Sequence, residues 1–315
     1  MGGRRGSCDR AALVLKRSHH PKAMPMTVMR LRSPLFAPGD SVRKAEKAMA
    51  SAADAVILDL EDSVAAGVKS QARAIVAALL PSLSRPGVIV RINAPGTEWY
   101  LADLAAVVPG RPAAIMLPKC TQAADLLAID HHLEALETAA GLLVGSIRVL
   151  PIATETTASV LALPTMLGNA RVAAICFGAE DLSADLGIDP RTEDGRYPAA
   201  ISQARAMVLL AAASCGLPAI DTPFPDPRNP GGLLAEAAQA AADGFAGKLC
   251  IHPDQIDAVN AAFTPAPSRL AWARAVKDGF AANPGAGVFT LDGKMIDRPH
   301  LRLAERILAA GLGAK

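Results

Sequence analysis

Eight short apolar runs recur through most of the chain and limit the folds that it can adopt more than any other feature. Each run is rich in β-branched residues and is continuous, without regular alternation of apolar and polar residues. Continuous runs of this kind are typical of strands buried on both faces of a parallel sheet. The runs occupy residues 33–39, 54–62, 87–93, 113–119, 147–155, 172–178, 217–223 and 247–253.

Alanine-rich segments separate the runs, and their apolar residues recur every three or four positions. This spacing predicts amphipathic helices, several of which end near a glycine. Eight strand–helix units match a (β/α)8 barrel, which typically has about 250 residues. A doubly wound open sheet is the alternative, but no G-x-G-x-x-G opens the first helix and no P-loop occurs. We therefore expect an α/β protein with a (β/α)8 TIM barrel over residues 29–265.

The two ends of the chain differ from this repeated region. Residues 1–28 are basic and contain one acidic residue, which predicts a disordered leader. Residues 266–315 contain a predicted helix, a glycine-rich hairpin and a terminal helix. We expect this C-terminal extension either to cap the same barrel or to form an arm that packs on a neighbouring subunit.

The overall composition argues against several classes of protein. The net charge is +2, so no overall field attracts the chain to nucleic acid or to an anionic membrane. Aromatic residues make up 3% of the chain, too few for platforms that stack single-stranded bases. No apolar run reaches the roughly 18 residues of a membrane span. The five scattered cysteines are typical of a reduced, cytoplasmic protein and form no zinc or disulfide pattern.

Polar and charged side chains lie at the carboxyl ends of the runs, whereas the amino ends offer little chemistry. Reactive residues of barrel enzymes lie at the carboxyl ends of the strands. The pattern therefore predicts an active site at that end of the barrel. The residues concerned are Glu61, Asp62, Arg91, Asn93, Lys119, Glu155, Glu180, Asp181, Asp221, Thr222 and His252.

Glu155 and Asp181 are one strand–helix repeat apart and can converge on one hard cation. Magnesium is typically held by one or two carboxylates, with water and substrate oxygens completing its coordination. The adjacent Glu180 and Asp181 point differently in any regular conformation, so only one of them is expected to be a ligand. We expect Glu155 and Asp181 to bind Mg²⁺, with Mn²⁺ as a substitute, and Glu180 to support the ligand set.

Arg91, Lys119 and His252 each have more than one interpretation. The planar guanidinium of Arg91 suits a carboxylate or a developing enolate oxygen, but it could instead form a salt bridge with Glu61 or Asp62. Lys119 could form a Schiff base with a carbonyl substrate, although a metal ion already serves as an electron sink. His252 is a general base, a substrate contact or a cap of the following helix.

Short motifs in a fixed order along the chain carry a family resemblance. They are "LRSPLFAPGD", "DAVILDLEDSV", "VRIN", "LPK", "PIATET", "FGAEDLSADLG", "IHPDQI" and "GKMIDRPH". Together, from about Arg30 to Arg306, they resemble the citrate lyase β-subunit-like branch of the HpcH/HpaI aldolase superfamily, which includes malyl-CoA and citramalyl-CoA lyases.

The resemblance implies a (β/α)8 barrel that assembles as a homotrimer or hexamer and uses Mg²⁺ to cleave 3-hydroxyacyl thioesters. It implies that Glu155 and Asp181 bind the metal and that Arg91 contacts the substrate carbonyl or carboxylate. It also implies that Asp297, on the C-terminal arm, acts in the site of a neighbouring subunit. We further expect substrate contacts or supporting roles for Arg32, Glu61, Asp62, Lys119, Glu180 and His252.

The expected reaction is Mg²⁺-dependent cleavage of a malyl-, citramalyl- or citryl-type thioester to a 2-oxo acid and an acetyl thioester. The small-molecule partner would be a CoA or acyl-carrier thioester. Two alternatives use the same site. The acyl group could pass to water, as in a malyl-CoA thioesterase. The chain could also be a carrier-dependent citrate lyase β subunit that has no independent activity on CoA esters.

Overall fold

Eight strands occur where the eight apolar runs predict them, and each is shorter than its run. The structure is a computed structural model that describes residues 29–83 and 87–311. The predicted leader at residues 1–28 therefore lies outside the described residues. The strands are β1 (Pro34–Pro38), β2 (Ala55–Asp59), β3 (Val88–Arg91), β4 (Ala114–Leu117), β5 (Arg148–Pro151), β6 (Ile175–Cys176), β7 (Ala219–Asp221) and β8 (Gly247–Lys248).

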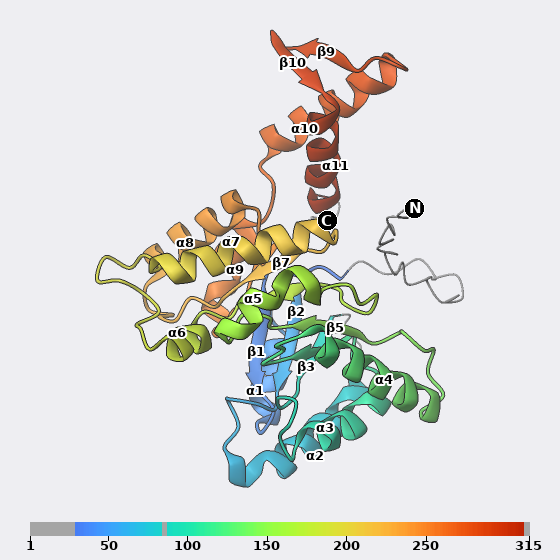
Figure 1. Cartoon of the computed structure of the whole chain (residues 1–315), viewed down its shortest axis with the longest axis vertical. Coiled ribbons are helices and arrows are strands. Elements are labelled where there is room, and N and C mark those ends of the chain that lie inside the picture. Colours follow the sequence, from blue (N-terminus) through green and yellow to red (C-terminus); the bar gives the residue numbers. More distant parts are fainter. Residues whose placement is uncertain (1–28, 84–86, 312–315) are drawn as a thin grey trace, which may run out of the picture.

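Helices alternate with these strands along the chain and lie around them (Figure 1). Their bounds are α1 (Val42–Met49), α2 (Lys69–Leu79), α3 (Tyr100–Val107), α4 (Ala123–Ala139), α5 (Thr157–Met166), α6 (Glu180–Leu186), α7 (Ala199–Ser214), α8 (Pro230–Asp243) and α9 (Ile256–Ala262). Short 3-10 segments are η1 (Ala66–Val68), η2 (Leu80–Ser82), η3 (Val108–Gly110) and η4 (Pro253–Gln255).

The strands pair in parallel, each with its neighbour in the sequence. β1 to β5 form one sheet in chain order, and β6 to β8 form a second. The expected α/β class with parallel strands is confirmed, but strand pairing runs through sheets of five and three strands, not through one closed sheet of eight. Isolated parallel bridges connect the two sheets at both junctions: Val149 with Val172, Ile152 with Cys176, and Leu35 with Cys250.

Alternate residues of the strands pack into two different apolar clusters. On β2, Val56 and Leu58 belong to a large cluster that includes the helices, whereas Ala55 and Ile57 belong to a smaller one. Because both faces of the strands are covered by apolar residues, their sequences are continuous apolar runs. The buried members of the smaller cluster are Leu31, Ala55, Ile57, Ile89, Ala114, Met116, Leu150, Ile152, Ala174, Cys176, Ile220 and Leu249.

Charged residues at the ends of β7 and β8 form a buried network with the helices. Lys248 is fully buried, and its Nζ donates to Asp221 Oδ2 at 2.9 Å, Glu236 Oε1 at 2.6 Å and the Thr222 carbonyl at 2.7 Å. Arg205 of α7 pairs with Asp221 at 3.0 Å. Asp221, which the sequence suggested for the active end of the strands, is therefore engaged in holding α7 and α8 against the sheet.

The C-terminal extension is a separate unit in which α10 (Pro267–Ala282) packs against α11 (Arg298–Gly311). Between them lies an antiparallel hairpin of β9 (Val288–Leu291) and β10 (Lys294–Asp297). This unit has its own small buried cluster. In Figure 1 it extends away from the parallel strands and does not cover their ends. Its packing on a neighbouring subunit stays a prediction.

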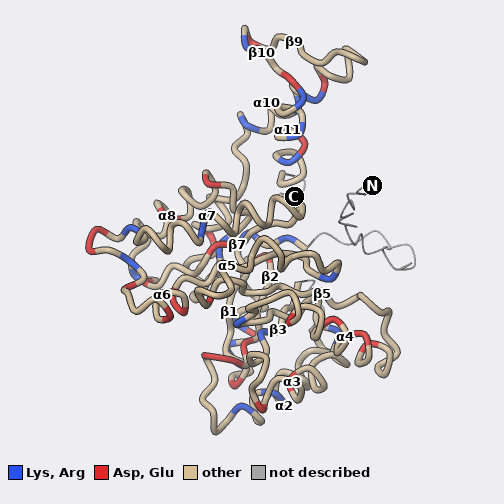
Figure 2. The backbone as a smooth tube through the Cα atoms, in the orientation of Figure 1, with Lys and Arg blue, Asp and Glu red and all other residues tan. Residues whose placement is uncertain are grey.

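Acidic and basic residues are interspersed over the backbone, without one large region of a single sign (Figure 2). This distribution agrees with the small net charge of the chain, +2. Among the described residues, no helix has the length and apolar character needed to cross a membrane.

Candidate metal and substrate site

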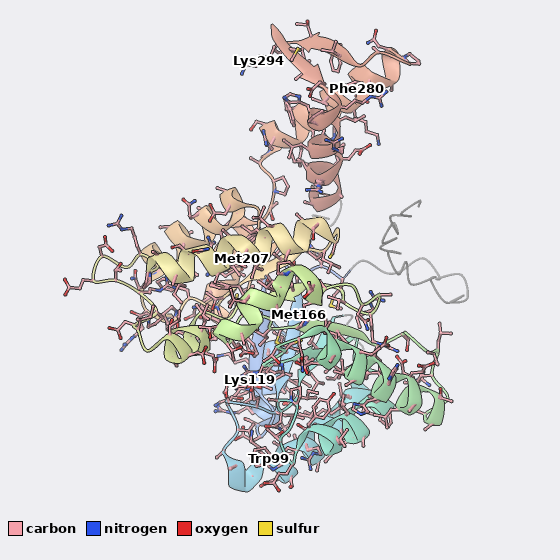
Figure 3. All side chains as sticks on the ribbon, viewed as in Figure 1. Trp99, Lys119, Met166, Met207, Phe280 and Lys294 are labelled. Carbon is pink, nitrogen blue, oxygen red and sulfur yellow. The ribbon has the colours of Figure 1, made fainter. Side chains whose placement is uncertain are left out.

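Five charged side chains from successive strand ends and from α6 form one connected cluster. Lys119, labelled in Figure 3, contacts three carboxylates, and Arg91 contacts one of them. Parallel strands bring these residues together because their carboxyl ends share one edge of the fold. The members are Glu61 after β2, Arg91 at the end of β3, Lys119 after β4, Glu155 after β5 and Asp181 in the first turn of α6. We call Glu61, Glu155 and Asp181 the carboxylate cluster.

Asp59 anchors Arg91 and was not among the residues predicted from the sequence. The two are directly opposite in the register of β2 and β3. Arg91 Nε and Nη2 donate to the two Asp59 carboxylate oxygens, each at 2.7 Å, and the guanidinium lies 4.8 Å from the centre of the Phe36 ring. Burial raises the pKa of Asp59, but the hydrogen bonds and charge of Arg91 outweigh it and hold that pKa below its ordinary value. The available signal in the sequence was an acid inside the apolar run at residues 54–62, before Glu61 and Asp62.

The remaining nitrogen of Arg91 faces the carboxylate cluster. Nη1 lies 3.1 Å from Glu61 Oε2 and 3.4 Å from the more exposed Asp62. Glu61 Oε2 is buried and accepts no hydrogen bond from the described residues, so its contact with Arg91 is ionic but poorly directed. Burial raises the pKa of Glu61 despite the nearby charges of Arg91 and Lys119. Arg91 thus forms the salt bridges with Glu61 and Asp62 that the sequence suggested. Its salt bridge with Asp59 is better aligned.

Lys119 connects the three carboxylates through both its backbone and its side chain. Its φ is 50°, in the left-handed region that non-glycine residues rarely adopt. In this conformation the backbone N–H donates to Glu155 Oε2, while Nζ lies 2.7 Å from Glu61 Oε1 and 3.9 Å from Asp181 Oδ1. Burial lowers the pKa of the Lys119 ammonium, but Glu61 raises it above its ordinary value. Because a protonated amine is not a nucleophile, this arrangement disfavours a Schiff base.

Glu155 is buried at the centre of the cluster, with 4% of its surface exposed. A Cβ added to Gly178 would lie 2.8 Å from Glu155 Cγ, so only glycine leaves room for the carboxylate in this position. Burial raises the pKa of Glu155 to about 8, and the charges of Glu61 and Asp181 contribute to the increase. The carboxylate is therefore short of compensating positive charge.

Asp181 and its neighbour Glu180 have different surroundings. Both lie in the first turn of α6, where the positive end of the helix dipole favours carboxylates. Asp181 turns toward Lys119 and is partly exposed, whereas Glu180 is exposed to solvent. Asp181 is thus the member of this pair that belongs to the carboxylate cluster.

The carboxylate cluster suits a hard divalent cation. Its donors are carboxylate oxygens, which Mg²⁺ prefers. The positive charge of Arg91 is shared with Asp59, so Lys119 is left as the main counter-charge of three acids. In the described part of the chain, no group of three or more His, Cys, Asp or Glu residues forms a complete metal cage. Mg²⁺ is typically held by one or two carboxylates with water or substrate oxygens, and the cluster offers donors of that kind.

Arg32 lies at the opposite end of the strands, and the structure does not bring it to the cluster. It precedes β1 and forms a two-pronged salt bridge with Asp54, which precedes β2, at 2.7 and 2.8 Å. Its Nη1 donates to Thr264 Oγ1 at 2.6 Å. Because Arg32 precedes its strand, it ties together the amino ends of the fold.

His252 caps the turn that follows β8. The ring Nδ1 of His252 accepts a hydrogen bond from the backbone N–H of Asp254 at 3.3 Å. The backbone N–H of His252 donates to Gln255 Oε1 at 3.2 Å. Of the three interpretations offered by the sequence, the observed contacts correspond to the cap.

Asp297 ends β10 on the C-terminal unit, remote from the carboxylate cluster of the same chain. Figure 3 shows Lys294 of the same strand far from Lys119. His300 Nδ1 lies 2.6 Å from Asp297 Oδ1 and holds this carboxylate at the start of α11. The residue therefore cannot serve the site of its own chain in this arrangement.

The fold and the cluster define a class of α/β protein with an acidic, cation-suited site at the carboxyl ends of parallel strands. The model of the HpcH/HpaI aldolase/citrate lyase family matches residues 32–253. The citrate lyase subunit beta of Escherichia coli (strain K12) is 36% identical over 282 residues, covering 88% of this chain and 92% of that protein. A (3S)-malyl-CoA thioesterase of Cereibacter sphaeroides is 35% identical, covering 88% of this chain and 93% of that protein.

A solved structure is also similar to this chain over most of its length. CitE from Mycobacterium tuberculosis, in complex with magnesium, acetoacetate and coenzyme A, matches with a TM-score of 0.72 and 35% identity. The match covers 89% of this chain and 97% of that one. The chain belongs to the HpcH/HpaI aldolase/citrate lyase family, as its motifs indicated.

Replacing Gly178 by alanine is expected to weaken divalent-cation binding about tenfold or more, because the new Cβ displaces Glu155. Titration with Mn²⁺, followed by electron paramagnetic resonance, measures the affinity. Gly168→Ala is the matched control, since nothing lies within 4 Å of a Cβ at that position. Equal Mn²⁺ affinity in the wild type and a folded Gly178→Ala variant would contradict the assignment of Glu155.

Proposed function

We propose that the chain is a Mg²⁺-dependent carbon–carbon lyase. Its substrate would be a 3-hydroxyacyl-CoA thioester of the malyl, citramalyl or citryl type, and its products a 2-oxo acid and an acetyl thioester. The observation that carries the proposal is one connected cluster, in which Lys119 contacts Glu61, Glu155 and Asp181, and Arg91 contacts Glu61. The ligands named for Mycobacterium tuberculosis CitE support it, since they include magnesium with coenzyme A and magnesium with oxaloacetate.

We infer that the eight strands close into a (β/α)8 barrel. Two observations support closure: bridges join the two sheets at both junctions, and the smaller apolar cluster combines residues from around the whole set of strands. In a closed barrel such a cluster fills the interior below the active-site end. The carboxylate cluster would then lie at the mouth of the barrel.

Glu155 and Asp181 would hold the Mg²⁺ ion, for which Mn²⁺ would be a substitute. When bound, the ion polarises substrate oxygens and lowers the pKa of the substrate hydroxyl group. Glu155 provides a buried oxygen donor whose position is set by the Lys119 N–H and by the room beside Gly178. Asp181 provides a partly exposed donor at the start of α6, on the side open to substrate.

Arg91 would stabilise the negative charge that develops on the thioester. When the carbon–carbon bond breaks, its electron pair passes to the acetyl thioester as an enolate, and the substrate hydroxyl becomes the carbonyl of the 2-oxo acid. Asp59 occupies Nε and Nη2, which leaves Nη1 directed toward the cluster. A donor held in advance in this way needs no rearrangement as the charge develops. A proton then adds to the enolate carbon to give the acetyl group.

Asp297 of a neighbouring subunit would accept the hydroxyl proton, in a homotrimer or hexamer. The C-terminal unit extends away from its own strands, so it is available to reach another chain. His300 fixes the orientation of the carboxylate. The unit also has exposed apolar side chains that could contact a second copy, among them Val288 and Met295.

Mixing two inactive variants tests this exchange of residues between subunits. Asp297→Asn and Glu155→Gln are each expected to have little activity alone. After dissociation and joint reassembly, roughly a quarter of the sites would combine an intact Glu155 with an intact Asp297 of a neighbour. Activity that reappears only after reassembly is the expected result. No recovery in properly reassembled oligomers would contradict the crossing arm.

Two alternative functions are supported by similarity to particular relatives. The similarity to the Cereibacter sphaeroides (3S)-malyl-CoA thioesterase fits a site that transfers the acyl group to water. The similarity to the Escherichia coli citrate lyase subunit beta fits a chain that acts on an acyl-carrier thioester and lacks independent activity on CoA esters. All three functions would use the same metal site, so the products and the carrier distinguish them.

Product analysis with malyl-, citramalyl- and citryl-CoA in the presence of Mg²⁺ tests the proposed reaction. We expect a 2-oxo acid together with acetyl-CoA, and a loss of about a thousandfold or more in Glu155→Gln and Asp181→Asn, because both carboxylates hold the ion. Glu134→Gln, at an exposed position of α4, is the control with the same change of charge.

Other products in this experiment would point to one of the two alternative functions. Free hydroxy acid and CoA would indicate a thioesterase, and turnover of acyl-carrier thioesters alone would indicate a carrier-dependent subunit. Full activity in excess EDTA would contradict a metal-dependent mechanism of any of the three kinds.

A further inference from the structure

We propose that Lys119 competes with the divalent cation for the carboxylate cluster and thereby makes binding of the cation depend on binding of the acid substrate. The inference deepens the proposed function and rests on it. It assigns to Lys119 a role other than nucleophile: an internal ammonium that weakens cation binding until a substrate carboxylate takes it away from the cluster.

The ammonium group of Lys119 lies among the oxygens that an ion would use. Lys119 Nζ lies 2.7 Å from Glu61 Oε1 and 3.9 Å from Asp181 Oδ1. Magnesium–oxygen bonds are about 2.1 Å long, so an ion on that Asp181 oxygen would lie within about 6 Å of Nζ. At this separation a divalent and a monovalent cation repel each other strongly outside bulk water. The ammonium and the ion therefore oppose each other at the cluster.

The carboxylate cluster depends on Lys119 for compensating positive charge. In the part of the chain that the structure describes, Arg91 is the other cation that forms an ion pair with these carboxylates. Arg91 is held from behind by two hydrogen bonds to Asp59. It therefore has little freedom to respond to an ion, and the response falls to Lys119.

The backbone of Lys119 is held in place, whereas its ammonium group can move. Its backbone N–H is bound to Glu155 Oε2, so the residue cannot leave the site as a whole. Its side chain is 40% exposed and has four flexible methylene groups, so the ammonium can swing toward solvent or toward a ligand. A bound substrate carboxylate would give it a new partner at the open side of the cluster.

These features couple binding of the divalent cation to binding of the acid substrate. The acid removes the competing ammonium from the cluster, and the ion adds the charge that the acid needs. Coupling of this kind is reciprocal, so each ligand tightens binding of the other by the same factor. A merely structural salt bridge predicts the opposite, because removal of Lys119 would then loosen the carboxylates and weaken cation binding.

The test compares the Mn²⁺ affinities of the wild type and Lys119→Gln by electron paramagnetic resonance, without substrate or turnover. We expect Lys119→Gln to bind Mn²⁺ about tenfold more tightly, since one nearby positive charge is removed. Lys119→Met is the second variant if the glutamine variant does not fold, and Lys119→Arg keeps the charge and should keep the wild-type affinity.

Arg111→Gln is the matched control. Arg111 precedes β4 as Lys119 follows it, is exposed, and has a similar left-handed backbone with φ of 57°. The control therefore removes the same charge, from the same unusual conformation, at the opposite end of the same strand. We expect its Mn²⁺ affinity to equal that of the wild type.

A second set of titrations adds saturating acetoacetate, the acid present in the Mycobacterium tuberculosis CitE complex. The acid should tighten Mn²⁺ binding by a larger factor in the wild type than in Lys119→Gln. Unchanged or weaker Mn²⁺ binding by Lys119→Gln, or an equal effect of acetoacetate in both proteins, would overturn the proposal. Glu155→Gln tests the metal site independently of Lys119. Loss of Mn²⁺ binding in this variant supports the metal site even if the proposal for Lys119 fails.

Discussion

Repulsion among neighbouring carboxylates is the constraint on which the candidate site depends. Glu61, Glu155 and Asp181 are gathered at one edge of the fold, and two of them are buried. Burial, together with the other two charges, raises the pKa of Glu155 to about 8. Arg91 and Lys119 offset part of this negative charge; two hydrogen bonds to Asp59 hold the Arg91 guanidinium, and a hydrogen bond to Glu155 holds the Lys119 backbone. The site is thus prepared for further positive charge, which a divalent cation would supply.

Much of this arrangement could be predicted from the sequence, because parallel strands have a simple relation to their sequence. Continuous apolar runs located all eight strands, and the residues that follow them meet at one edge. Glu61, Arg91, Lys119, Glu155 and Asp181 were named on this ground, and the structure brings all five together. Identification of the family rested on the same motifs and is confirmed by the family model.

The positions of Asp59, Asp221 and Arg32 follow physical rules other than the pattern of strand ends. Asp59 was overlooked because it lies inside the run at residues 54–62, and its partner across the β2–β3 register cannot be read from one sequence. Asp221 faces the helices because side chains alternate along a strand, and its neighbour Ile220 takes the other face. Arg32 precedes its strand and so lies at the opposite end. Whether the C-terminal unit packs on its own chain or on a neighbouring one depends on tertiary packing, which no local pattern encodes.

Anomalous X-ray diffraction from crystals soaked in Mn²⁺ tests the central claim most directly, namely that Glu155 and Asp181 hold the divalent cation. The account predicts an anomalous peak about 2.1 Å from a carboxylate oxygen of each residue. Saturating Mn²⁺ that gives no peak at this cluster, or a peak bound by other residues alone, would contradict the account.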